Sequence, residues 1–169
     1  MTRDKEMMLV HQAKNGSAAA FSELYEIIYR DLYRFAYYTL KNGSDAEDTV
    51  SDTVTDAWAQ IGTLRKEESF RGWIFRILSN KCRQKLKAYL DKTEELPEDL
   101  CSPEEDTGQN VDVRNAFAKL EEEERMIISL NLFGGYSSRE IGEMLSMNDN
   151  TVRSRQKRGL AKMADYLRG

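Results

Sequence analysis

Basic and amide side chains recur at helical spacing in two separate stretches of this 169-residue chain, where they could bind phosphates and bases. The first stretch, residues 71–90, contains arginines and lysines but no acidic residue. Four of its side chains follow one another at spacings of 4, 3 and 4: Arg76, Asn80, Arg83 and Lys87. This spacing places all four on one face of a helix. Beside aromatic residues, such a face suits contact with a nucleic-acid backbone and stacking on single-stranded bases.

The second stretch, residues 136–163, is typical of two short helices joined by a tight turn. Ser137 and Glu140 have capping-box spacing, so the first helix is predicted to begin there, with an apolar stripe at Ile141, Met144 and Leu145. The turn falls at residues 146–148, and Asn148 can cap the helix that follows.

That following helix is predicted to have an apolar inner edge and a cationic outer edge. The inner edge is expected to consist of Val152, Leu160 and Met163, and the outer edge of Arg153, Arg155, Lys157 and Arg158. A capped helix, a short turn and a helix with these two edges form the layout of a helix-turn-helix, which is also compatible with an ordinary helical hairpin.

Residues for other kinds of chemistry are scarce. The chain has a single histidine, His11, and its two cysteines, Cys82 and Cys101, lack ligand-like spacing. There is no glycine-rich phosphate loop and no pair of carboxylates in an apolar setting. We therefore predict no catalytic residue, metal site or cofactor, and reduced structural thiols in a cytoplasmic protein. No stretch approaches the roughly 18 apolar residues that span a membrane, and the N-terminus lacks the apolar core of a signal peptide.

Composition predicts an all-α fold of two small helical domains, the C-terminal one containing the helix-turn-helix. Hydrophobic residues make up 40% and charged residues 32%, Gly and Pro are few, and the net charge of −4 argues against coating nucleic acid by charge alone. Residues 91–112 hold both prolines and many acids without apolar periodicity, so they are predicted to be a linker. The predicted domains are thus residues 1–90 and 113–169.

Apolar periodicity predicts most of the helices that carry these side chains. The expected helices lie at residues 4–14, 17–41, 44–61, 69–90, 113–120 and 122–133, followed by the helix-turn-helix. The helix at 44–61 is expected to be capped by Ser44 and to bury Val50, Val54, Ala57, Trp58 and Ile61. Its acidic residues beyond the first turn form either a solvated face or a docking face for a basic partner.

These segments together resemble a known family. The order AFSELYEIIYRDLYRFAYYTL, DAEDTVSDTVTDAWAQI, SFRGWIFRILSNKCRQKLK is similar to the region 2 domain of extracytoplasmic-function (ECF) sigma factors of bacterial RNA polymerase. The later segment LEEEERMIISLNLFGGYSSREIGEMLSMNDNTVRSRQKRGLAKM resembles their region 4 domain. The sequence departs from the usual pattern at Thr49, Glu121, Asn150 and Gln156.

The resemblance implies a dissociable specificity subunit without chemistry of its own. Its partners would be core RNA polymerase (the clamp helices of the largest subunit and the flap), promoter DNA and an anti-sigma factor, with no small-molecule substrate and no insertion into a membrane. The implied polymerase-binding residues are Asp45, Asp48, Ser51, Asp52 and Thr55. The implied −10 element residues are Leu64, Arg65, Lys66, Phe70, Trp73, Arg76, Asn80, Arg83 and Lys87. The implied −35 element residues are Ser138, Arg139, Asn150, Thr151, Arg153, Ser154, Arg155, Lys157 and Arg158.

Linker length leads to a hypothesis about domain arrangement. As a relaxed coil, residues 91–112 would span about 25 Å, and fully extended about 70 Å. In the family that the sequence resembles, the two promoter elements lie one to two duplex turns apart, at about 35 Å per turn. We therefore expect the free protein to be compact, and binding to core polymerase to separate its domains.

Two other function classes are compatible with the same residues. One is a free-standing helix-turn-helix regulator with an N-terminal sensor or dimerisation domain, which would bind duplex operator without polymerase. The other is an adaptor whose basic faces bind acidic proteins, although two all-basic faces count against it. An enzyme fits the residues least well.

Overall fold

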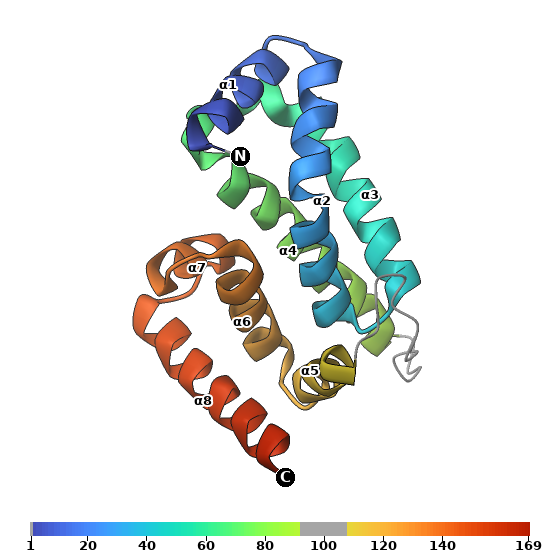
Figure 1. Cartoon of the computed structure of the whole chain (residues 1–169), viewed down its shortest axis with the longest axis vertical. Coiled ribbons are helices and arrows are strands. Elements are labelled where there is room, and N and C mark those ends of the chain that lie inside the picture. Colours follow the sequence, from blue (N-terminus) through green and yellow to red (C-terminus); the bar gives the residue numbers. More distant parts are fainter. Residues whose placement is uncertain (1, 92–107) are drawn as a thin grey trace.

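The structure is a computed structural model, and it describes residues 2–91 and 108–169. Within these ranges every regular element is helical, which confirms the all-α prediction (Figure 1). The elements, in chain order, are α1 (Arg3–Lys14), α2 (Ala18–Leu40), α3 (Gly43–Gln60), the 3₁₀ turns η1 (Ile61–Thr63) and η2 (Glu67–Ser69), α4 (Phe70–Asp91), α5 (Gly108–Ala118), α6 (Glu122–Gly134), α7 (Ser138–Leu145) and α8 (Asp149–Arg168).

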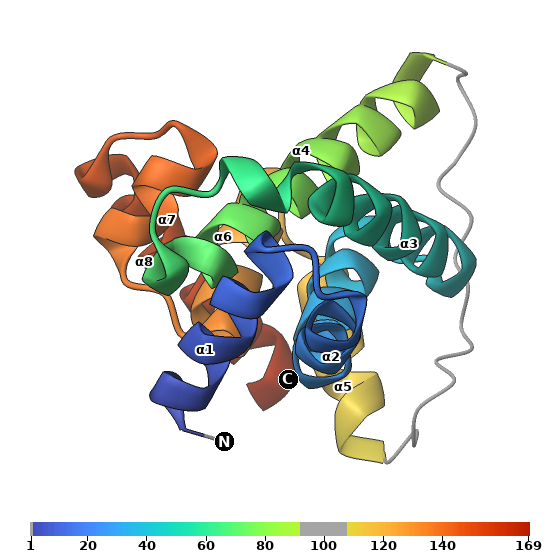
Figure 2. The same ribbon diagram turned by 90° about the horizontal axis from the view of Figure 1, so that it is seen from above.

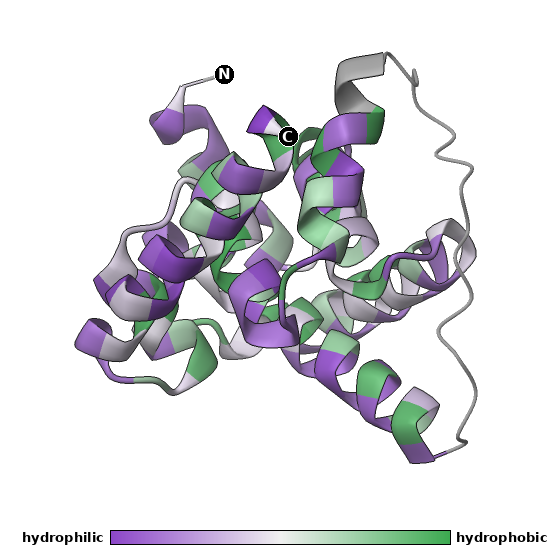
Figure 3. Cartoon of the chain, turned by 90° about the horizontal axis from the view of Figure 1, so that it is seen from below, coloured by the Kyte–Doolittle hydropathy of each residue, from purple (hydrophilic) through white to green (hydrophobic). Residues whose placement is uncertain are grey.

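Helix α2 is the central element of the fold. Ser17 caps it by accepting a hydrogen bond from the backbone N–H of Ala20 at 3.1 Å, which satisfies one of the free donors of the first turn. Its buried side chains include Leu24, Ile28 and Leu32. With these side chains α2 contacts α1, α3 and α4 on the N-terminal side and α6 on the C-terminal side. Apolar and polar residues alternate along the helices in the way that such packing requires (Figure 3).

Helix α3 differs from its prediction at its start and on its buried face. Its cap is Asn42, which accepts from the N–H of Asp45 at 2.9 Å, and not Ser44. Trp58, expected in the core, is 39% exposed. Threonines occupy the buried face instead, because their hydroxyls can bond backwards along the helix: Thr49 to the carbonyl oxygen of Asp45 at 2.7 Å, and Thr53 to that of Thr49 at 2.8 Å. A pattern read from apolar residues alone misses such a face.

The C-terminal half consists of α5 to α8. Helix α5 begins at Gly108, inside the segment predicted as linker, and residues 92–107 of that segment lie outside the described residues. Val152 and Met163 are buried on α8 as predicted, but Leu160 is 43% exposed, so its predicted inward position is wrong. The buried position beside it is Gly159, where an added Cβ would lie 2.6 Å from Ile128 Cδ1. The missing side chain is what lets α8 approach α6.

The two halves pack directly on each other (Figures 1 and 2). Tyr38 on α2 contacts Phe117 and Phe133 of the C-terminal half, with ring centroids 4.6 and 5.2 Å apart. Phe75 on α4 meets Tyr136 edge to face at 5.6 Å. The buried core therefore runs without interruption from one half into the other.

This aromatic contact gives a first prediction, Tyr38→Ala. Loss of this partly buried ring, with its two ring contacts across the interface, should lower the free energy of unfolding by about 2–3 kcal/mol and loosen the two halves. Urea denaturation measures the first effect, and energy transfer between dyes at Gln60 and Arg168 measures the second. Tyr25→Ala is the matched control, because the aromatic partner of Tyr25 is Tyr29 on the same helix. Equal energy transfer in both variants would show that Tyr38 does not hold the halves together.

Candidate nucleic-acid interface

The predicted basic face of α4 forms, but the C-terminal half covers part of it. Arg76, Asn80 and Lys87 are exposed and Arg83 is half-buried. Arg76 Nη2 donates to the carbonyl oxygen of Glu143 at 2.6 Å, and Arg83 Nη2 donates to that of Leu145 at 3.5 Å. Both oxygens lie in the last turn of α7, where free carbonyls carry the negative end of the helix dipole. Two of the four predicted residues thus bind protein in this arrangement.

The loop between α3 and α4 combines buried anchors with exposed cations. Leu64 and Phe70 are only 6% and 2% exposed, so these two predicted contact residues hold the loop in the core. Arg65 and Lys66 lie between them and are exposed. Trp73 is half-buried, with its ring 6.2 Å from that of Phe70.

A cleft separates this loop from α7. Its volume is about 680 Å³, and its walls include Arg65, Trp73 and Arg76 on the N-terminal side and Glu140 on the other. The hydroxyl of Tyr136, which also lines the cleft, is buried without a hydrogen-bond partner among the described residues, and burial raises the pKa of that phenol. The wall formed by the loop and α4 therefore carries most of the cations together with Glu68, and the wall formed by α7 is acidic.

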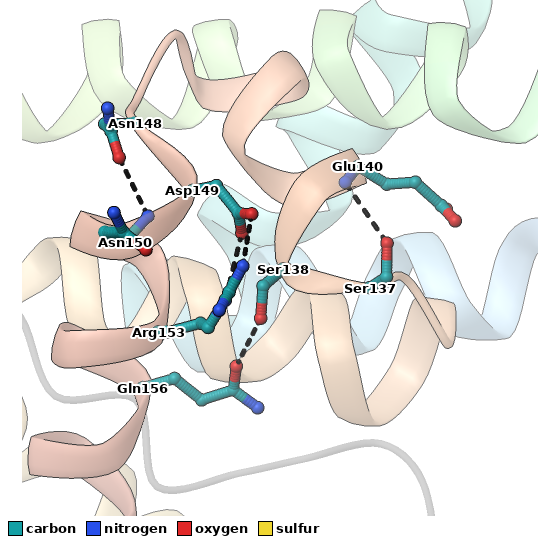
Figure 4. A network of polar contacts seen from close by, with 8 residues as sticks. All are labelled: Ser137, Ser138, Glu140, Asn148, Asp149, Asn150, Arg153 and Gln156. Carbon is teal, nitrogen blue, oxygen red and sulfur yellow. Dashed lines mark hydrogen bonds and ion pairs between the residues drawn. The ribbon is translucent and has the colours of Figure 1, made fainter.

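The helix-turn-helix is built as its caps predict (Figure 4). Ser137 accepts from the N–H of Glu140 at 3.2 Å, and Asn148 accepts from that of Asn150 at 2.8 Å. The turn brings the backbone of Met147 so close to Gly142 that an added Cβ would stand 2.7 Å from its carbonyl oxygen. A glycine is needed at this position, because the clash would be with backbone that cannot rotate away.

The predicted −35 residues lie on or beside the outer surface of α8. The exposed ones are Arg139, Asn150, Arg153, Ser154, Lys157 and Arg158, and the partly buried ones are Ser138, Thr151 and Arg155. Several already have partners. Arg153 binds Asp149 with two hydrogen bonds, the shorter at 2.5 Å, which raises the pKa of its guanidinium (Figure 4). Ser138 donates to Gln156 Oε1 at 3.4 Å.

Acidic residues of α6 bind two further cations of α8. Arg155 forms an ion pair with Glu123, and Lys162 binds Glu124 at 2.7 Å. Glu124 is only 1% exposed, so Lys162 compensates a buried carboxylate. Lys162 therefore helps to hold α8 on α6.

The acidic face of α3 divides into residues that pair with α4 and residues that face outward. Asp45 binds Lys85 at 3.6 Å and Asp56 binds Lys81 at 2.7 Å, so these carboxylates attach α3 to α4. The other four predicted polymerase-binding residues form one exposed strip along the helix: Asp48, Ser51, Asp52 and Thr55.

Three contacts near these surfaces were not predicted from the sequence. Glu6 binds Arg71 through two hydrogen bonds, His11 and Lys14 converge on Glu67, and the buried Arg125 donates to backbone carbonyls. Each joins residues that are distant in sequence or binds backbone, so helical spacing contains no signal for it.

Metal, thiol and membrane features are few. Among the described residues no group of three or more His, Cys, Asp or Glu could hold a metal ion. Cys82 is a buried free thiol whose pKa is raised by burial, and Cys101 lies outside the described ranges. None of the helices described is both long and apolar enough to cross a bilayer.

Comparison with known proteins matches both halves to one family. Sigma-70 region 2 matches residues 24–89, and sigma-70 region 4 matches residues 110–163. The chain is 30% identical to the RNA polymerase sigma factor SigV of Bacillus subtilis over 144 residues, covering 82% of this chain and 85% of SigV. The chain belongs to the sigma-70 family of RNA polymerase sigma factors, in its ECF group.

Other members support this assignment along the whole chain. The ECF RNA polymerase sigma factor SigM of Mycobacterium tuberculosis is 29% identical over 167 residues, which cover 97% of this chain and 84% of SigM. The structure of CnrH in complex with the cytosolic domain of CnrY matches with a TM-score of 0.72 and 25% identity, covering 96% of this chain and 97% of CnrH. RpoE from Bartonella quintana, solved with the anti-sigma factor NepR, has the same fold, with a TM-score of 0.74, 22% identity and coverage of 88% and 96%. A free-standing regulator is not favoured, because region 2 accounts for α2 to α4.

Proposed function

We propose that this ECF sigma factor binds core RNA polymerase, directs it to promoters through a −35 and a −10 element, and helps to open the duplex. The observation that carries the proposal is the order of two sigma-70 regions along the chain, each with an exposed cationic helix face. The first domain, residues 1–90, would bind polymerase and the −10 element, and the second, residues 113–169, the −35 element. The protein would work in the cytoplasm and catalyse no reaction itself.

Helix α3 would dock on polymerase through its exposed strip. Within the described ranges, Asp48 and Asp52 lack the ion pairs that Asp45 and Asp56 have, so their charge is available to a basic partner such as the clamp helices. Ser51 and Thr55 fill the same strip. The Ser51 hydroxyl could donate a hydrogen bond there, while that of Thr55 already donates to the carbonyl oxygen of Ser51 at 3.0 Å and could accept one.

Reversing these two charges tests the docking face. Asp48→Lys/Asp52→Lys should weaken assembly with core polymerase by a few kcal/mol, on the order expected when like charges are opposed, and should abolish run-off transcription at limiting concentration. Glu23→Lys/Glu26→Lys on α2 changes the net charge equally and is the control. Equal affinity of both variants for core polymerase would exclude α3 as the docking face.

The −10 element would be read by the loop between α3 and α4 and by the basic face of α4. Arg65 and Lys66 are exposed for phosphate contact, and Trp73 presents an aromatic ring beside them for stacking on a base. Asn80 and Lys87 continue the same face along α4, on the side where a displaced strand would run.

The −35 element would be read by α8, inserted in the major groove with its N-terminal half toward the bases. Arg155→Ala should cost about 1–3 kcal/mol at a preferred −35 sequence and relax preference there, because a bidentate guanidinium contact to guanine is lost. Lys157→Ala is the comparison, expected to weaken all sequences alike. Competition binding of holoenzyme to −35 variants measures both, and an unchanged ranking for Arg155→Ala would refute the assignment.

Promoter binding would require the two halves to separate. Arg76 and Arg83 donate to the end of α7 in the closed arrangement, and Arg155 is paired with Glu123, so three proposed DNA contacts are occupied within the protein. Polymerase would hold the halves apart and release Arg76 and Arg83. Glu123 lies in the same half as Arg155, so the DNA itself must displace that ion pair. Docking of α3 leaves the interface between the halves untouched, which allows polymerase to bind first.

Energy transfer tests this opening. Dyes at Gln60 on α3 and Arg168 on α8 should lose transfer when core polymerase is added, before any promoter is present. Promoter DNA added to the sigma factor alone should change the signal little, because the phosphates must compete with contacts that are already made. Transfer that stays constant on addition of polymerase would contradict the opening mechanism.

An anti-sigma factor is the remaining proposed partner. It is supported by RpoE from Bartonella quintana, which has the same fold and was solved in complex with the anti-sigma factor NepR. We propose no small-molecule substrate and no insertion in a membrane.

A further inference from the structure

Helix α1 lies against the loop that connects α3 and α4 (Figure 2). It precedes the residues that match sigma-70 region 2, which begin at position 24. One side of α1 is fixed in the core, because Leu9, Val10 and Ala13 are at most 4% exposed. Its contacts with the loop are therefore made from a rigid support.

The first contact is a small polar network at η2. Glu67 Oε1 accepts hydrogen bonds from His11 Nδ1 and from Lys14 Nζ, each at 3.4 Å. On the other side of the ring, Asn15 Nδ2 lies 3.3 Å from His11 Nε2. One neutral tautomer satisfies both contacts: Nε2 accepts from the Asn15 amide while the proton on Nδ1 is donated to the carboxylate. The imidazole ring is thus oriented from α1 toward Glu67.

The second contact lies one helical turn further along the chain. Arg71 donates to Glu6 from Nε at 2.8 Å and from Nη2 at 3.0 Å, and its Nη1 lies 3.7 Å from Asp31. A two-pronged guanidinium–carboxylate bond fixes direction as well as distance. Helix α1 therefore holds the chain at both Glu67 and Arg71, directly after the exposed Arg65 and Lys66.

We propose that α1 positions the −10 reading loop, with His11, Lys14 and Glu67 as its positioning residues. The inference rests on the proposed function, in which Arg65, Lys66 and Trp73 contact the opening strand. A loop held in place before binding loses less conformational freedom when the strand arrives, so both affinity and base discrimination gain. None of the three positioning residues needs to touch DNA.

A positioning role and a purely electrostatic role predict opposite changes in DNA affinity when Glu67 is neutralised. Neutralising an acid beside a DNA-binding surface raises affinity for DNA, because repulsion of the phosphates falls. Loss of positioning acts in the opposite direction. Glu67→Gln is therefore expected to weaken strand binding although it removes a negative charge, and the sign of the effect identifies its cause.

The matched control is Glu23→Gln. Glu23 also pairs with a lysine of α1, Lys5, at 3.3 Å, but it belongs to α2 and does not contact the loop. Both variants remove one carboxylate that pairs with α1. Glu67→Gln weakens contacts with His11 and Lys14 that hold the loop, whereas Glu23→Gln weakens the contact with Lys5 and leaves the loop attached.

The experiment uses the full chain and the holoenzyme in turn. In the free protein, hydrogen exchange of the amides at residues 64–69 should become about three- to tenfold faster in Glu67→Gln and stay unchanged in Glu23→Gln. In the holoenzyme, binding of forked promoter DNA with correct and altered −10 sequences should show reduced discrimination for Glu67→Gln alone. His11→Ala should have a smaller effect of the same kind, because Lys14 still pairs with Glu67. The double variant should be no worse than Glu67→Gln alone, which already disrupts both contacts.

The other results would overturn either the positioning role of α1 or the −10 assignment itself. Unchanged exchange, or additive effects in the double variant, overturns the proposal. Faster exchange with full discrimination also overturns it, provided that Trp73→Ala and Arg65→Ala reduce discrimination in the same assay. If those two variants also leave discrimination intact, the −10 assignment itself fails, and the positioning role fails with it.

Discussion

A buried guanidinium at the junction of the two halves holds the whole arrangement together. Arg125 on α6 is only 6% exposed, and it donates from Nη1 to the carbonyl oxygen of Leu120 at 2.6 Å and from Nε to that of Thr39 at 3.3 Å. The oxygen of Thr39 lies in the last turn of α2, and that of Leu120 lies in the turn between α5 and α6. Burial lowers the pKa of Arg125, while the neighbouring Glu122 and Glu124 oppose this shift, and an arginine remains charged in such a site. Without Arg125, these carbonyls would lose a hydrogen-bond partner in a buried setting, a costly arrangement.

The same chemistry recurs elsewhere in the interface between the halves. Arg76 and Arg83 bind the last turn of α7 as Arg125 binds the last turn of α2. Each guanidinium thus meets the negative end of a helix dipole, and a phosphate could take the place of that negative end. The protein has a net charge of −4 and still keeps cationic faces for DNA, because its own carbonyls and acids occupy part of them in the closed arrangement.

The sequence was sufficient for the elements and insufficient for their contacts. Helical spacing and capping residues predicted the all-α fold, the helix-turn-helix and the roles of Ser137 and Asn148, because these depend on residues a few positions apart. Trp58 and Leu160 were misplaced, because threonines and a glycine can line a buried face that apolar periodicity does not reveal. The pairs of Glu6 with Arg71 and of His11 with Glu67 join residues 65 and 56 positions apart, and only the packing of α1 brings them together.

The contact of Arg76 with Glu143 has one more consequence, which concerns acidity. Its acceptor is a backbone carbonyl oxygen, which has no acid–base equilibrium of its own near neutral pH. A closure based on carboxylates would weaken in acid near about pH 4, where protonation removes the acceptor's charge. Closure through carbonyls has no such dependence. A ligand that competes for Arg76 can therefore open this contact, whereas acid does not act on its carbonyl acceptor.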